Sequence, residues 1–188
     1  MMGMAAEVLQ EAADLGIIQG YGDNTFRPTQ RITRGQVACF LVRALGTLIN
    51  EPGEQTAGGV YGNMTINTAG VKLKDTTITG NLYLTGGVGL GNVELENVTV
   101  LGKIVLCGAG EAEKGENSVI LRNVIADSFE VDSLTDQFLT VRAEGLTDIG
   151  ATTVSTSSYL EDLTDDGLGL RVITLDGESG TRLQLAGN

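Results

Sequence analysis

The sequence predicts a mainly β fold: a parallel β-helix (solenoid) of about five coils, preceded by a small helix-loop-helix segment. Three observations predict it. The spacing of apolar residues changes from a helical period to strict alternation near residue 50, the alternating stretches recur every 20–26 residues, and turn-forming residues separate them. We therefore divide the 188 residues into a helical segment at 1–49, a linker at 50–58 and a β-helix at 59–188.

The first pattern in the helical segment is that of an amphipathic helix. Apolar residues recur at helical spacing from Met4 to Leu15. Gly16 is expected to end this helix, because glycine adopts the left-handed capping conformation without strain. Glycine, aspartate, asparagine and proline then gather in residues 20–28, which predicts a loop.

A second helix pattern follows the loop. Thr33 and Gln36 have the spacing of a capping box, in which each side chain bonds a backbone amide at the start of the helix. The helix is therefore expected to begin at Thr33, and its apolar stripe runs from Val37 to Leu48. Residues 50–58 combine glycine, proline and polar residues, which is typical of a linker.

Apolar and polar residues alternate through the rest of the chain, and the alternating stretches form two interleaved series. Members of the first series are 22 and 26 residues apart, and members of the second are 22 and 25 residues apart. A repeat of this length with short strands predicts a solenoid, because one coil cannot bury its apolar edge alone and stacked coils can. The first series starts at Val71, Val93 and Val119, and the second at Leu82, Ile104 and Phe129.

An aspartate or asparagine follows each member of the first series at the same position. Asp75, Asn97 and Asn123 are expected to form a ladder, in which side chains hydrogen-bond from coil to coil. Residues 108–117 are polar, which predicts a loop that protrudes from one coil. The alternation continues beyond about residue 150 but does not fix the register there.

Charge is distributed unevenly along the chain. Residues 1–50 carry four acids and four arginines, whereas residues 51–188 carry 20 acids and 8 bases, which accounts for the net charge of −12. Such an acidic body repels the phosphates of nucleic acid, so no nucleic-acid partner is expected. No apolar run reaches the roughly 18–20 residues of a membrane-spanning helix. The arginines of the first segment suit either a small anionic ligand or an ordinary solvated surface.

Residues suited to catalysis are scarce. The chain has no histidine, which removes the commonest general base and metal ligand. Bases such as Lys72 and Arg122 are scattered among strand positions of the β-helix, and no acid cluster accompanies them at matching coil positions. The acidic run at 161–167 is more typical of a solvated loop than of a weak calcium site. We therefore expect no catalytic residues, no metal and no cofactor, and a protein that is not an enzyme.

Several motifs follow one another in residues 5–46. They are Gly20-Tyr21-Gly22-Asp23, Thr25-Phe26-Arg27-Pro28, Ile32-Thr33-Arg34-Gly35-Gln36 and Leu41-Val42-Arg43-Ala44-Leu45-Gly46. In this combination the segment resembles the S-layer homology (SLH) family. The resemblance covers nearly one repeat of that family and about a quarter of the chain.

The resemblance implies export and attachment to the bacterial cell envelope. Family members typically bind anionic, pyruvylated secondary cell-wall polysaccharide through the arginine that corresponds to Arg34, which follows Thr33. Tyr21, Gly22 and Asp23 correspond to the loop that shapes the binding groove. Arg34 is expected in the first turn of a helix, where backbone amides and the helix dipole favour an anion. In the alternative, Arg34 and Asp23 only cap the helix and the loop.

The chain departs from the family pattern in three respects. Gly35 and Gln36 replace the family's Ala-Glu, the chain has no tryptophan, and it has one copy of a repeat that most members carry three times. Either three chains associate to rebuild the threefold unit, or the segment serves only in assembly. The second part resembles, at the level of the fold, the right-handed parallel β-helix of pectate-lyase-like proteins, an architecture that also serves adhesins and stalks.

Together these observations predict a non-enzymatic structural protein of the bacterial cell surface. We expect it to be extracellular and either attached to the cell wall or assembled into a layer or fibre as a homo-oligomer (a trimer or a filament), with the β-helix as rod or stacking unit. No signal peptide is visible, and we expect it to have been removed. The alternative is a wall-anchored β-helix that binds or cleaves acidic polysaccharide.

Overall fold

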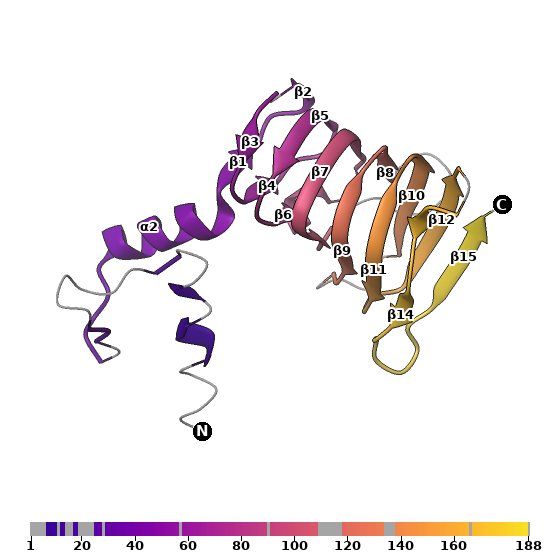
Figure 1. Ribbon diagram of the computed structural model, residues 1–188. Helices are drawn as coiled ribbons and strands as arrows, with labels where there is room; N and C mark the ends of the chain where they lie inside the picture. The colour runs from indigo at the N-terminus through magenta and orange to yellow at the C-terminus, as the bar shows by residue number, and fades with distance from the viewer. Residues whose placement is uncertain are drawn as a thin grey trace. The chain divides into compact units, whose positions relative to one another are not determined.

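The computed structural model of the chain contains two compact units, Met1–Gly46 and Thr47–Asn188 (Figure 1). The residues that the structure describes are 7–10, 12–13, 17–18, 25–27, 29–56, 58–89, 91–108, 118–133, 138–165 and 167–187.

The first unit contains helix α2 (Arg34–Leu45). The predicted capping box is confirmed: the Gln36 backbone N–H donates to Thr33 Oγ1 at 3.2 Å, and the Thr33 backbone N–H donates to Gln36 Oε1 at 2.9 Å. The helix ends at Gly46, whose φ of 65° suits glycine, so the apolar stripe does not reach Leu48 as expected. Of the first predicted helix, residues 7–10 and 12–13 are helical, and the rest of it lies outside the described residues.

The second unit is a parallel β-solenoid, as predicted. We call one turn of the solenoid a rung. Each rung but the last contributes strand residues to three columns, and neighbouring rungs pair in parallel within every column (Figure 1). The predicted right hand of the coil stays a prediction.

The columns follow one another around each rung. The first column contains β1 (Thr47–Ile49), β4 (Met64–Ile66), β6 (Leu82–Leu84), the end of β7 (Val93–Leu106), the end of β9 (Ile125–Val131), the end of β11 (Asp148–Val154) and β14 (Ile173–Leu175). The second contains β2 (Gly53–Thr56), the start of β5 (Val71–Ile78), the start of β7, β8 (Val119–Arg122), β10 (Leu139–Gly145), β12 (Ser158–Thr164) and β15 (Leu183–Gly187). The third contains β3 (Val60–Tyr61), the end of β5, the middle of β7, the starts of β9 and β11, and β13 (Gly169–Leu170).

The strand register confirms both series of repeats. Val71 pairs with Val93 and Val93 with Val119, so the first series occupies one position of the second column. The second series occupies one position of the first column in the same way, with Leu82, Ile104 and Phe129 in successive rungs. Repeats of unequal length keep this register because the extra residues lie in the connections between the first and second columns. One such connection carries the short 3-10 helix η1 (Gly86–Val88).

The core fills the space inside the rungs. Alternate strand residues point inward, as in β5, whose inward-facing residues at its ends, Val71 and Ile78, are at most 2% exposed. Each fully buried side chain of this size contributes about 1.5–3 kcal/mol, and the inward residues of successive rungs form one contiguous core. The largest side chains in it are Phe129, Met64, Ile66, Leu73, Ile78, Leu82, Leu84, Leu95, Ile104, Leu106, Leu121 and Leu139.

The predicted linker at residues 50–58 is part of the solenoid. Gly53–Thr56 form strand β2, which pairs with β5, and the solenoid begins at Thr47 rather than at residue 59. The segment reads as a linker because it belongs to a terminal rung. Such a rung has a neighbour on one side only, so its residues bury little surface and need not be apolar.

Candidate functional site

The predicted attachment residues fall partly within the described chain. Thr33 is the N-cap of α2 and Arg34 is its first residue, so the structure brings the two together at the start of a helix. Both are exposed, and the first turn contains no acidic residue. The orphan amides and the helix dipole therefore favour an anion there. Tyr21, Gly22 and Asp23 lie outside the described residues.

The predicted ladder stands at the corner between the second and third columns. Asp75, Asn97 and Asn123 all have positive φ angles of 49°, 55° and 54°. The Asn97 amide donates to Asp75 Oδ1 at 3.0 Å, and the Asn123 amide donates to Asn97 Oδ1 at 3.0 Å. Asparagine and aspartate suit this corner because they tolerate the left-handed conformation and also supply the bonds between rungs.

Charged side chains cover the outer surface of the second column, which we call the charged face. Lys72 Nζ lies 2.8 Å from Glu94 and 2.8 Å from Glu96, and Lys74 Nζ lies 2.8 Å from Glu54. Further along the column, Arg122 forms ion pairs with acids of the rungs on both sides of its own. Arg142 forms an ion pair with an acid of the following rung. Further close pairs are Arg122–Glu94 at 2.7 Å, Arg122–Glu144 at 2.9 Å and Arg142–Glu161 at 2.7 Å.

These ion pairs shift the protonation equilibria of their members. The hydrogen bond from Lys74 lowers the pKa of Glu54, and the one from Lys72 lowers the pKa of Glu96. The hydrogen bonds that the Lys72 ammonium donates to Glu94 and Glu96 raise the pKa of Lys72. Both carboxylates and the ammonium group are therefore held in their charged forms at neutral pH.

The sequence interpretation of these bases as scattered is incomplete, because four of them share the outer surface of one column: Lys72, Lys74, Arg122 and Arg142. Acids do stand beside them at matching positions of neighbouring rungs, since Lys72 pairs in register with Glu94 and Lys74 with Glu96. The signal is present in the sequence as Lys-x-Lys followed by Glu-x-Glu 22 residues later. Aligning the outward residues of the repeats, and not only the inward ones, finds it.

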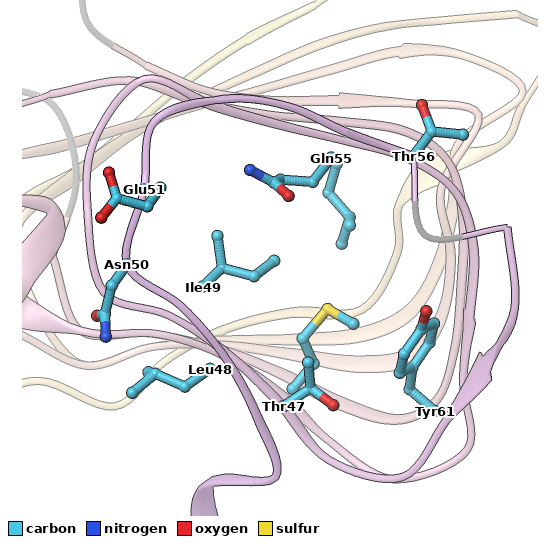
Figure 2. Close-up of a pocket in the computed structure, with 10 residues that line it drawn as sticks. Thr47, Leu48, Ile49, Asn50, Glu51, Gln55, Thr56 and Tyr61 are labelled. Carbon is cyan, nitrogen blue, oxygen red and sulfur yellow. The ribbon is translucent and has the colours of Figure 1, made fainter.

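A hollow of about 340 Å³ opens at the N-terminal rung, which consists of β1, β2 and β3. Its floor is apolar and is formed by Met64 and Leu73 of the next rung. Ile49 and Gln55 point into the opening, as Figure 2 shows. The other lining residues are Thr47, Leu48, Asn50, Glu51, Thr56 and Tyr61.

A second hollow, of about 320 Å³, opens at the C-terminal rung, which consists of β14 and β15. Leu160, Leu170 and Leu185 line it. The carboxylate of Asp162 also faces it and accepts a hydrogen bond from the Leu170 backbone N–H at 3.0 Å. Neither hollow contains a group of acids and cysteines that fits a metal, and we find none elsewhere among the described residues.

The comparison with known protein families concerns the start of α2, which carries Thr33 and Arg34, and the segment before it. Residues 1–38 match the family model of the S-layer homology domain. No curated protein and no solved structure matches the chain. The SLH match includes the first turn of α2 and does not extend into the solenoid.

The SLH domain indicates association with the cell surface or cell wall. Members of this family typically bind cell-wall polysaccharide, and the exposed Arg34 stands within the matched residues. No helix in the described part of the chain is long and apolar enough to cross a membrane.

Proposed function

We propose that this protein is a non-enzymatic structural component of the bacterial cell surface. Its SLH domain attaches it to anionic secondary cell-wall polysaccharide, and its solenoid serves as a rod and stacking unit that assembles with further copies. The observation that carries the proposal is the SLH match over residues 1–38, with Arg34 exposed in the first turn of α2.

The chemistry of the helix start supports the choice of an anionic polymer. Thr33 uses its hydroxyl to cap α2, which leaves the guanidinium of Arg34 to reach outward from the same turn. A guanidinium binds a carboxylate through two parallel hydrogen bonds, and the amides of the first turn add to the attraction. A pyruvylated sugar offers such a carboxylate.

The solenoid supports a structural role in two ways. Its charged face pairs Lys72, Lys74, Arg122 and Arg142 with carboxylates, so these bases are engaged in holding rungs together. Its interior is a packed core and not a binding cleft. Both properties suit a rigid rod.

Co-sedimentation of the purified chain with isolated cell-wall sacculi tests the attachment. We expect the wild-type protein to pellet with sacculi, and the Arg34→Ala variant to lose about tenfold in affinity, as for the loss of one charge-assisted bidentate contact. Arg43→Ala is the matched control, because Arg43 is exposed in the last turn of the same helix. Equal binding of all three proteins would remove Arg34 from the site, and no binding by any of them would overturn wall attachment.

An assay for polysaccharide cleavage tests the non-enzymatic role. The chain is incubated with acidic polysaccharides, and the release of unsaturated products is followed by ultraviolet absorbance. We expect no release above a buffer control. Product formation that Lys72→Ala abolishes would make the protein a wall-anchored enzyme instead.

A further inference from the structure

Among the described residues, no strand pairs with the outer edges of the two terminal rungs of the solenoid. In the pairing order of the described strands, β1 and β15 stand at opposite ends. A free strand edge is a template for another strand, and proteins usually cover it. Each of the two ends also opens into a hollow with an apolar floor.

The backbone groups at the two ends are complementary. Thr47 donates its N–H to the following rung, and Ile49 accepts from it, so the groups of Leu48 between them point to the open side. At the other end, the Val172 carbonyl and the Asp176 N–H form hydrogen bonds with the preceding rung. Because the direction of the backbone groups alternates along a strand, the N–H and C=O groups of Ile173 and Leu175 point outward, on either side of Thr174. This is the pairing that joins every two adjacent rungs.

Side-chain sizes at the two ends match when the register is extended by one rung. The strand pairs of the second column place Leu185 opposite Leu160 and Gly53 opposite Val71, so Leu185 falls opposite Gly53 of a second copy. Leu185 is 60% exposed, and Gly53 has open space where a side chain would be. Two residues further on, Gly187 falls opposite Gln55, whose side chain reaches across the opening (Figure 2). At both positions a long side chain meets a glycine.

Charge favours the same arrangement. The N-terminal rung carries Glu51 and Glu54, so two such ends repel each other. At the C-terminal rung, the exposed Arg182 precedes β15 and falls opposite Asn50, beside Glu51, in the extended register. Residues 171–187 carry two arginines and two acids, so the C-terminal rung has no net charge, and contact between unlike ends avoids the repulsion between two N-terminal ends.

We propose that the occupant of each open end is a second copy of this chain, joined head to tail. The C-terminal rung of one copy adds to the N-terminal rung of the next, with Leu48 of one copy opposite Thr174 of the other, so that the parallel ladder runs on between copies. This proposal rests on the stacking role proposed above and names its contact surfaces. The two surfaces differ, so the contact does not close on itself and builds a filament.

The register is tested by cross-linking between two single-cysteine proteins. Both native cysteines, Cys39 and Cys107, are free and are first replaced by serine. One protein then carries Leu48→Cys and the other Thr174→Cys. Residues paired in a sheet lie within disulfide range, so a dimer is expected under mild oxidation only when the two proteins are mixed. A dimer formed by the Leu48→Cys protein alone would mean head-to-head contact and would overturn the proposal, as would no dimer in the mixture.

Sedimentation velocity of the full chain tests the contact itself. We expect the mass to grow with concentration, and Leu185→Lys to weaken association at least tenfold. Leu146→Lys is the matched control, because Leu146 is 61% exposed on the side of the solenoid and away from both ends. Circular dichroism confirms that each variant is folded. Monomers at all concentrations, or equal association of the two lysine variants, would overturn the joint.

The failure of this proposal and that of wall attachment are distinguishable. Leu185→Lys is expected to bind sacculi as a monomer with wild-type affinity, because the substitution leaves Arg34 intact. Arg34→Ala, introduced into both single-cysteine proteins, is expected to leave the mixed disulfide unchanged. In the full chain, the same substitution is expected to leave end-to-end association at the wild-type level. Loss of stacking in Arg34→Ala would show that assembly runs through the SLH domain and would overturn the end-to-end joint.

Discussion

Helix α2 and the solenoid achieve order in different ways. Both bonds of the capping box are present in α2, yet none of its 12 residues is buried. In β7, the inward residues Val93 and Leu95 are at most 1% exposed, and the strand has neighbours on both sides. A cap contributes about 1 kcal/mol, whereas each buried side chain contributes about 1.5–3 kcal/mol. The solenoid is therefore stabilised by its buried core, whereas the described contacts of α2 are local bonds.

The largest expected effect comes from the solenoid core. Phe129→Ala removes a fully buried side chain and is expected to lower the free energy of unfolding by about 3–5 kcal/mol. Leu41→Ala removes an apolar side chain from an exposed position of α2 and is expected to change the same transition by less than about 0.5 kcal/mol. Chemical denaturation followed by circular dichroism measures both. Similar losses would mean that the two units unfold together.

A smaller effect is expected in the ladder. Asn97→Ala removes two hydrogen bonds and places alanine at a positive φ, which costs about 1–3 kcal/mol. Asn97→Gly removes the same bonds but keeps the backbone relaxed, so its loss should be smaller by about 1 kcal/mol. Equal losses in the same denaturation assay would show that the backbone conformation contributes nothing.

A gain in stability is expected from one buried hydroxyl. Thr152 Oγ1 is buried without a hydrogen-bond partner among the described residues, so Thr152→Val should raise the free energy of unfolding by about 1 kcal/mol. Thr147 is the matched control, because its buried hydroxyl donates to the Leu121 carbonyl at 2.9 Å and accepts from the Val124 N–H. Thr147→Val should therefore destabilise. Thermal unfolding of the two variants separates these outcomes, and a shift of the same sign in both would contradict the assignment.

The smallest effect of a single residue is expected on the charged face. The pKa values of Glu54 and Glu96 are lower when folded, so their ion pairs stabilise the fold above the ordinary glutamate pKa of 4.5 and stop doing so as the pH falls through the folded values. The melting temperature should fall below about pH 4.5, and less steeply in Glu96→Gln. The pKa of Lys72 is raised, so its contribution persists until the pH rises above the ordinary lysine value of 10.5. Melting curves from pH 3 to 11 measure both limbs, and a flat acid limb would mean that these pairs are screened by solvent.

Sequence patterns predict the interior of the solenoid better than its ends or its surface. Inner rungs need apolar residues at the same inward position, so valine recurs at Val71, Val93 and Val119. The corner occupied by Asn97 needs a positive φ, so asparagine or aspartate recurs there. The terminal rung escapes detection, since residues 50–56 lie in a rung with one neighbour only and residues 50–58 carry no apolar alternation. The ion pairs escape because they depend on register between rungs.

The candidate attachment site is predictable to a similar degree. The capping box fixes Thr33 and Arg34 at the start of α2 from their spacing alone, because a cap is a local feature. The ligand proposed for them does not follow from local spacing, since ligand binding depends on residues brought together from distant parts of a fold. Residues 21–23 lie outside the described chain, so their predicted role stays a prediction.

The stacking of rungs also has a mechanical consequence. The rung from Asp75 to Asn97 contains 22 residues, which occupy only about 4.8 Å of the solenoid axis while stacked. Pulled straight, the same residues span about 70 Å. A solenoid pulled from one end is therefore expected to unfold one rung at a time. Each rung that unfolds would lengthen the chain by more than ten times the height that the rung occupies when stacked.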